Sequence, residues 1–292
     1  MTLSFEQLAE LGPTHGVHDL ACPLCSHQVS ARGSRRRVLR IWRDDEHFAS
    51  FACARCGEKG WARAGDKGTR PSPERLAAIR RDAAARQAAE QAESLRKARW
   101  LWSSGTPITS ATPAFTYLRE PRAYHGPIPA TLRYLRPRKP EHHHAMIAAV
   151  GMAHELEPGA YTIANDALAG VHLTLLRPDG SAKADDVENA KLIIGQGSSG
   201  CPICLMPPND LLGLAIAEGI EDALSIHEAT GLGAWAAGCA NRLPCLAENI
   251  PSWVNCVTIA ADADRDGRRN ALALGRAIEA RGIEAILQGL GP

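Results

Sequence analysis

Two Cys-x-x-Cys pairs lie near the N-terminus: Cys22 and Cys25 form the first, and Cys53 and Cys56 form the second. Four thiolates arranged in two such pairs can surround one zinc ion tetrahedrally. Two disulfides are the alternative, but the chain has nine cysteines and begins without a secretory signal, which favours a reducing compartment. We therefore predict one structural Zn²⁺ and a cytoplasmic protein.

Acidic side chains follow two apolar runs in the C-terminal part of the chain. Glu218 comes directly after the run 214–217, and Asp262 and Asp264 follow the run 257–261. If both runs are strands of one parallel sheet, these carboxylates gather at its carboxyl edge, where ligands bind. Because gathered carboxylates repel one another, such a site suits Mg²⁺ or Mn²⁺. Helix caps and surface acids are the alternative reading.

Basic side chains form two further groups of candidates. Arginines and an aromatic residue inside the cysteine-flanked segment suit phosphate contacts and base stacking on single-stranded nucleic acid. They are Arg35, Arg36, Arg37 and Trp42. In the middle of the chain, Arg177, Lys183 and Lys191 form the second group. For both groups the alternative is a solvated surface.

The formal charge of +1 conceals a division between the two halves of the 292-residue chain. Residues 1–140 carry 24 lysines and arginines against 13 acidic residues, whereas residues 141–292 carry 9 against 19. A basic half suits a polyanion and an acidic half suits cations. No apolar stretch approaches the roughly 18 residues that a membrane span requires, so we expect no membrane contact.

Strand-like and helical patterns suggest four regions that would position these residues. The strands 38–42 and 47–52 predict an antiparallel ribbon within a zinc-binding domain, 1–64. Region 65–140 is expected to hold a linker, a long helix over 74–102 and then short helices and loops. The strands 145–150, 171–176 and 191–195 predict a small mixed sheet within 141–212.

Region 213–292 alternates between short apolar runs and helical patterns. The expected order is strand 213–217, helix 220–230, strand 233–237, strand 254–260, helix 268–281 and strand 283–287. Such alternation predicts an α/β fold, with a parallel sheet and helices on both faces.

Two segments of this last region resemble the signature motifs of the Toprim domain. They are Ile216-Ala217-Glu218-Gly219-Ile220-Glu221-Asp222-Ala223-Leu224-Ser225 and Ala261-Asp262-Ala263-Asp264-Arg265-Asp266-Gly267. The resemblance implies a compact α/β fold with a divalent-metal site. It implies the glutamate role, as general base or as ligand, for Glu218 and metal binding for Asp262 and Asp264, with Asp222 and Asp266 as less secure matches.

The order of a zinc ribbon, a mixed block and a Toprim-like region is similar to that of DnaG-type and of phage or plasmid primases. The segment 172–184, with Lys191 and Leu192, resembles the block that precedes Toprim in mobile-element primases. One departure is Cys25, where many such primases carry histidine, and zinc accepts either ligand.

The resemblance implies a DNA primase that makes short RNA primers on single-stranded DNA from nucleoside triphosphates. In such an enzyme, Arg177, Lys183 and Lys191 are candidates for contacting the incoming triphosphate or the template strand. Because no GxxxxGK[ST] motif is present, a separate replicative helicase would open the duplex. The alternatives are a non-catalytic DNA-binding protein similar to RecR-type recombination mediators and a Toprim nuclease.

Overall fold

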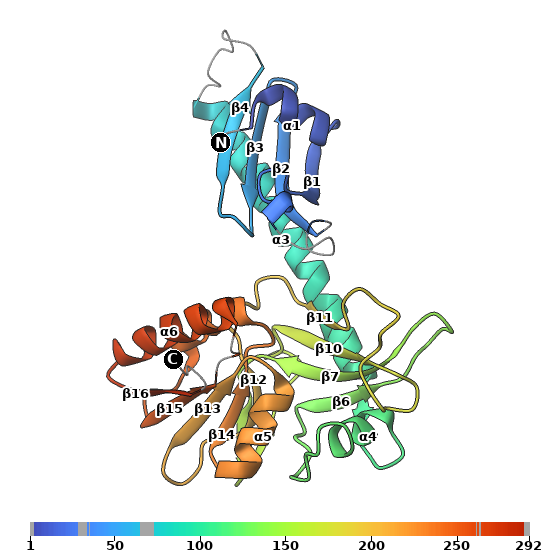
Figure 1. Cartoon of the computed structure of the whole chain (residues 1–292), viewed down its shortest axis with the longest axis vertical. Coiled ribbons are helices and arrows are strands. Elements are labelled where there is room, and N and C mark those ends of the chain that lie inside the picture. The colour runs from blue at the N-terminus through green and yellow to red at the C-terminus, as the bar shows by residue number, and fades with distance from the viewer. Residues whose placement is uncertain are drawn as a thin grey trace. The chain divides into compact units, whose positions relative to one another are not determined.

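The computed structural model of this chain describes residues 3–28, 34, 36–64, 73–260, 262 and 264–288. The chain divides into two compact units, residues 1–81 and 82–292, and each is described by itself. Figure 1 labels their helices and strands. Within the described residues, no helix combines the length and the apolar character needed to cross a membrane.

The first unit is built on a four-stranded antiparallel sheet in the order β1-β2-β3-β4. Its elements are α1 (Phe5–Leu11), β1 (Gly16–Ala21), the short 3₁₀ turn η1 (Ser26–Gln28), β2 (Arg37–Asp45), β3 (Phe48–Cys53) and β4 (Lys59–Arg63). The predicted ribbon is the β2–β3 hairpin, and β1 and β4 extend it on either side. Alternate residues of the strands face inward, where Leu39, Ile41 and Phe51 pack with Leu8 of α1.

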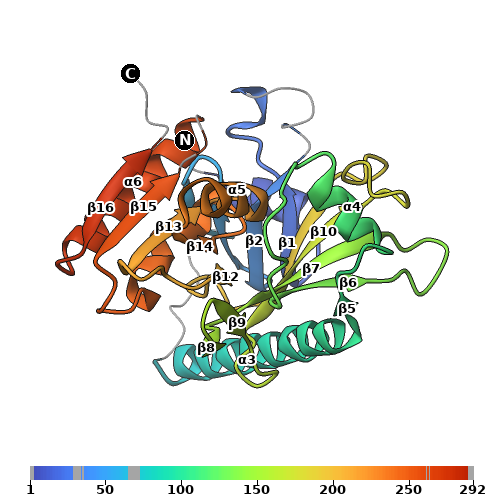
Figure 2. The same ribbon diagram turned by 90° about the horizontal axis from the view of Figure 1, so that it is seen from below.

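The long helix α3 (Pro73–Ser104) confirms the helix expected over 74–102. Its sequence is rich in alanine, arginine, glutamate and glutamine and holds no glycine before Gly105, which favours a helix. Near its C-terminal end, Ala98 and Trp102 are buried in one cluster with Ala145 and Ile147 of the second unit. Figure 2 shows this part of α3 running along the sheet that contains β6 and β7.

The middle of the chain forms a five-stranded sheet in the order β11-β10-β7-β6-β5. Its elements are β5 (Thr106–Pro107), α4 (Pro113–Arg119), β6 (Leu132–Leu135), β7 (His144–Val150), the small hairpin β8 (His154–Glu157) with β9 (Ala160–Thr162), β10 (Gly170–Leu176) and β11 (Lys191–Ile194). All its pairings are antiparallel, whereas we expected a mixed sheet. The strands β5 and β6 come from the segment expected to hold only helices and loops, because two- and four-residue strands leave no periodic pattern.

The C-terminal sheet has the order β12-β14-β13-β15-β16. Its elements are β12 (Ile203–Met206), β13 (Gly213–Ala217), α5 (Ile220–Thr230), β14 (Gly233–Ala236), the 3₁₀ segment η2 (Ala240–Asn249), β15 (Cys256–Ala260), α6 (Arg265–Glu279) and β16 (Glu284–Gln288). Four strands are parallel, as expected, and β12 adds an antiparallel edge. The sequence did not indicate β12, which lies before the expected start of this region at residue 213.

The two sheets of the second unit share their hydrophobic core. One cluster joins α3 and α6 to residues of both sheets, and the other joins α4 and α5 to both sheets. A bridge between Gly151 and Ile203 also links the end of β7 to β12. The middle sheet is therefore joined to the C-terminal sheet through the shared core and at the β12 edge.

Candidate functional site

The four cysteines of the two Cys-x-x-Cys pairs come together in the first unit. Their sulfur atoms all lie within 4.8 Å of one another, and those of Cys25 and Cys53 are 3.9 Å apart. Cys22, Cys25 and Cys53 are buried, while Cys56 is exposed. Four thiols at this spacing fit a tetrahedral zinc site and agree with the prediction from the spacing.

Backbone amides prepare these thiols for a metal. Burial alone would raise the pKa of Cys53, but the amides of Cys56 and Arg55 outweigh it and bring that pKa to about 7. Burial raises the pKa of Cys22 to about 12. Because the thiolate is the form that binds metal, a cation in this cluster would have to displace the protons of the buried thiols.

The outer face of the four-stranded sheet carries aromatic side chains. The strand registers place Val17, Trp42, Ser50 and Trp61 in one row across β1 to β4. Trp42 is half-buried, and Trp61 is 64% exposed. The rings of Phe48 and Trp61 stack with centroids 6.1 Å apart.

Cationic side chains accompany these rings. The guanidinium of Arg63 lies 5.7 Å from the centre of the Phe48 ring and 6.0 Å from that of Trp61. Arg36 and Arg37 are exposed, whereas Arg35 lies outside the described residues. Arg43 faces the opposite way, where it is buried and donates to the Gly12 carbonyl. Aromatic faces combined with cations suit single-stranded nucleic acid.

The acidic residues leave neighbouring strands at the same edge of the C-terminal sheet. The parallel register pairs Ala217 of β13 with Ala260 of β15, so Glu218 and Asp262 emerge side by side from the ends of their strands. Burial raises the pKa of Glu218, and the charges of Asp262 and Asp264 raise it further. The backbone of Ala240 and the charge of Lys191 oppose this shift. Glu218 therefore lies close enough to Asp262 and Asp264 for their charges to act on it, while the metal-binding role of the three carboxylates stays a prediction.

The carboxylates are less tightly grouped than the cysteines. Within the part of the chain that the structure describes, the four cysteines are the only set of three or more His, Cys, Asp or Glu residues whose ligand atoms all lie within 4.8 Å of one another. Asp264 caps α6 by accepting a 2.7 Å hydrogen bond from the Gly267 amide, and Asp266 pairs with Arg269 at 3.1 Å. Carboxylate oxygens at the ends of parallel strands suit Mg²⁺, because this ion prefers oxygen ligands, keeps several bound waters and needs few protein ligands.

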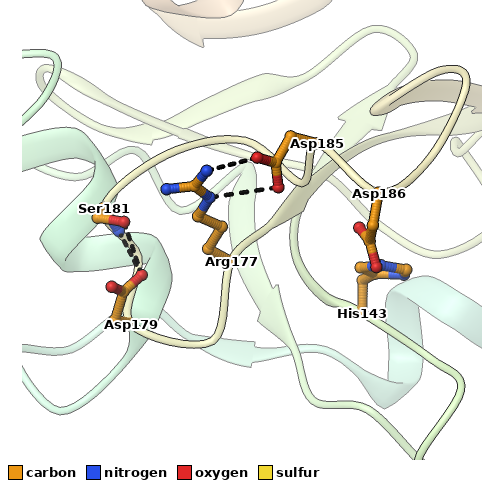
Figure 3. A network of polar contacts seen from close by, with 6 residues as sticks. All are labelled: His143, Arg177, Asp179, Ser181, Asp185 and Asp186. Carbon is orange, nitrogen blue, oxygen red and sulfur yellow. Dashed lines mark hydrogen bonds and ion pairs between the residues drawn. The ribbon is translucent and has the colours of Figure 1, made fainter.

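Two of the three mid-chain cations are already engaged by carboxylates. Arg177 donates to both oxygens of Asp185, at 3.4 and 2.5 Å, in the connection between β10 and β11 (Figure 3). In the same connection Asp179 accepts from Ser181, and Asp186 pairs with His143 at 2.9 Å. The contacts of Arg177 and Asp179 lie within the connection that carries Lys183. The contact of Asp186 ties this connection to His143, next to the start of β7.

Lys183 forms an ion pair of 2.8 Å with Glu221, whose side chain is only 8% exposed. The same Glu221 oxygen accepts a 2.6 Å hydrogen bond from the Tyr117 hydroxyl, and Arg122 donates to that hydroxyl at 2.9 Å. Burial would raise the pKa of Glu221, but Lys183 and Tyr117 outweigh it and bring it to about 2. Sequence reasoning missed this network. Glu221 precedes Leu224 by three residues, a helical spacing that puts both side chains on neighbouring positions of the buried face of α5. Nothing in the sequence linked Glu221 to Tyr117.

His172 is a second buried polar group beside the acidic edge. It is 2% exposed, and its Nδ1 atom has no hydrogen-bond partner. A Cβ added to Gly238 would lie 3.3 Å from its ring, and the Gly238 amide donates to the Glu218 carbonyl. Burial and the nearby cation Lys191 lower the pKa of His172 to about 4, so the imidazole is neutral at pH 7.

Two protein-family models match parts of the second unit. Residues 213–289, which include Glu218, Asp262 and Asp264, match the model of the Toprim domain. The chain contains a Toprim domain. The preceding residues 92–203 match a domain of unknown function, DUF7146. This matched segment contains Tyr117, His172 and Lys183. No curated protein and no solved structure is detectably similar to the chain.

The Toprim domain occurs in primases, nucleases and RecR-like proteins, and it binds Mg²⁺. The carboxylates at the strand ends therefore lie in a domain that binds Mg²⁺ and that enzymes such as primases and nucleases contain.

Proposed function

We propose that the chain is a DNA primase, which joins nucleoside triphosphates into short RNA primers on a single-stranded DNA template. The observation that carries the proposal is the placement of Glu218, Asp262 and Asp264 just beyond the ends of two paired parallel strands in a Toprim domain. The proposal is also supported by the first unit, which holds a four-cysteine cluster and a sheet face with aromatic and basic side chains.

Glu218, Asp262 and Asp264 would hold the divalent ions, which supply charge neutralisation at the reacting phosphate and activation of the attacking 3′-hydroxyl. Glu218 is the half-buried member of the set, and its raised pKa reflects burial near like charges. Asp262 is exposed and can reach a ligand from the solvent side. The N-cap hydrogen bond orients Asp264, because one of its oxygens is held by the Gly267 amide.

Cations on the adjacent middle sheet would bind the triphosphate. Lys191 at the start of β11 is exposed and close enough to Glu218 and His172 to affect both. Lys183 keeps a quarter of its side chain exposed while paired with Glu221. Arg177, bound to Asp185, would have to exchange that partner to reach a phosphate.

The outer face of the four-stranded sheet would hold the template. Trp61 and Phe48 offer ring faces for bases, and Arg63, Arg36 and Arg37 offer charge for phosphates. Primer synthesis on a duplex would require a separate helicase to open it. The arrangement of domains suits a role in phage, plasmid or mobile-element replication.

The test is incorporation of labelled ribonucleotides on single-stranded DNA by the full chain with Mg²⁺ or Mn²⁺. Synthesis of short products by the wild-type chain, lost in Asp262→Asn, would support a primase. Cleavage of the template without synthesis would favour a nuclease. DNA binding with neither reaction, on varied templates and with both metals, would favour the RecR-like alternative.

A further inference from the structure

The DUF7146 segment and the Toprim domain meet in a buried polar network beside Glu218. Tyr117, on α4, donates to Glu221 in the first turn of α5. Lys183, from the connection between β10 and β11, binds the same carboxylate oxygen. Two separate segments therefore converge on one side chain of α5, three residues beyond Glu218.

Glu221 in turn lies against the backbone that presents Glu218. A Cβ added to Gly219 would lie 3.5 Å from the free oxygen of Glu221 and 2.5 Å from an oxygen of Asp222. Gly219 is the N-cap residue of α5 and has no side chain with which to cap the helix. Both carboxylates thus lie beside Gly219: a side chain at residue 219 would collide with Asp222 and would touch Glu221 at van der Waals distance.

The network is costly to loosen because its members are buried. Tyr117 is fully buried and Glu221 is 7% exposed, so separating them would leave a buried carboxylate short of a donor. Arg122 holds the Tyr117 hydroxyl from the solvent side, with its guanidinium 5.2 Å from the ring centre. The tyrosine hydroxyl therefore has a fixed direction, and so has the carboxylate that it contacts.

We propose that Tyr117 is a positioning residue for the Toprim metal site: through Glu221 it fixes the Glu218–Gly219 turn, so that the Glu218 carboxylate is held in place to bind a divalent ion. Arg122 acts through Tyr117. The inference rests on the proposed role of Glu218 as a metal ligand. It assigns the DUF7146 segment a part in metal binding, although none of its residues is a proposed ligand.

The chain offers a matched control for Tyr117. Tyr124 is equally buried and belongs to the same hydrophobic cluster, but its hydroxyl donates at 2.6 Å to the Pro127 carbonyl within its own segment rather than to Glu221. Each Phe variant removes one buried hydroxyl; Tyr117→Phe loses two hydrogen bonds and Tyr124→Phe loses one. The loss of a buried hydroxyl would lower the stability of both variants, whereas a positioning effect would weaken Mn²⁺ binding in Tyr117→Phe alone.

The experiment is Mn²⁺ titration of the zinc-loaded full chain, with free Mn²⁺ measured by electron paramagnetic resonance, in the absence of DNA and nucleotides. Glu218→Gln reports whether the site exists. We expect Tyr117→Phe to weaken Mn²⁺ binding about 10-fold, as is usual when a residue that orients a metal ligand is changed. Tyr124→Phe should bind Mn²⁺ like the wild type.

The outcomes separate this inference from the proposed function. If Glu218→Gln weakens binding and Tyr117→Phe behaves like Tyr124→Phe, the positioning role is overturned and the metal site stands. If Glu218→Gln binds Mn²⁺ like the wild type, the assignment of the site fails and the inference fails with it. Should Tyr117→Phe not fold, the exposed Arg122→Gln replaces it, with an expected loss of about fivefold for one hydrogen bond; unchanged Mn²⁺ binding there would overturn the role.

Discussion

Tyr117 donates a 2.6 Å hydrogen bond to Glu221, which lies 104 residues further along the chain. The contact joins α4, in the segment that matches DUF7146, to the first turn of α5 in the Toprim domain. Lys183 and Arg122 complete the network, so the middle sheet and the Toprim domain are linked by charge as well as by their shared hydrophobic core.

The pairing of Glu221 predicts a pH-dependent stability. Because the folded protein depresses the pKa of Glu221 from 4.5 to about 2, the pair stabilises the fold fully above pH 4.5. This contribution falls as the pH drops from there towards 2. The shift corresponds to on the order of 3 kcal/mol.

Urea unfolding of the wild type and of Glu221→Gln between pH 7 and pH 3 measures this contribution. The difference in the free energy of unfolding should be largest at pH 7 and should shrink below pH 4.5. Glu248→Gln, a change of an exposed glutamate, should match the wild type throughout. A difference for Glu221→Gln that is independent of pH would contradict the assignment of the shift to this carboxylate.

The cysteine cluster predicts one zinc ion per chain, with Zn–S distances of about 2.3 Å. Cys53→Ser should abolish zinc binding and lower the thermal stability of the first unit, because metal affinity at such sites contributes to folding. Elemental analysis and X-ray absorption are the measurements. The exposed Cys245→Ser should retain the full zinc content. Purified wild-type chain without zinc under reducing conditions would rule out the site.

The aromatic sheet face predicts that single-stranded DNA binds through Trp61. Because stacking on one aromatic ring is worth about 1–3 kcal/mol per base, Trp61→Ala should weaken binding about 10-fold or more. Fluorescence anisotropy of the full chain with labelled oligonucleotides measures the affinity. Trp253→Ala removes an indole that is 52% exposed in the other unit and serves as the control. Equal losses in the two variants would argue against a template surface on this sheet.

Phosphate contacts by Arg63 predict a change in salt dependence. Removing one cation that neutralises a phosphate should reduce the slope of log affinity against log salt by about 0.7 for a single strand. The slope of Arg63→Ala, compared with that of the wild type across a salt series, gives the result. An unchanged slope with weaker binding would mean that Arg63 acts by packing on Phe48 and Trp61 rather than by charge.

The acidic edge predicts loss of primer synthesis in Glu218→Gln, Asp262→Asn and Asp264→Asn. Removing a charge weakens metal binding and raises the barrier by several kcal/mol. Binding of single-stranded DNA by the first unit should remain. Asparagine is also a good N-cap, so Asp264→Asn should keep α6 intact. Asp266→Asn, which changes an exposed partner of Arg269, is expected to affect synthesis least. Wild-type synthesis by Asp262→Asn would refute the site.

Local pattern in the sequence was enough to predict much of this molecule. The Cys-x-x-Cys spacing predicted the cluster because each pair forms a turn from neighbouring residues. Alternating strands and helices predicted the parallel strands from β13 to β16, because their apolar runs and helical stripes are long enough to have a period. The end of each predicted strand then indicated Glu218, Asp262 and Asp264.

Tertiary structure decided what depends on contacts between distant segments. The antiparallel pairing of the middle sheet, and the addition of β5, β6 and β12, followed from partners that no local pattern specifies. The link from Tyr117 to Glu221 has the same origin: a buried carboxylate must find donors, and the packing of α4 against α5 determined which donors those were.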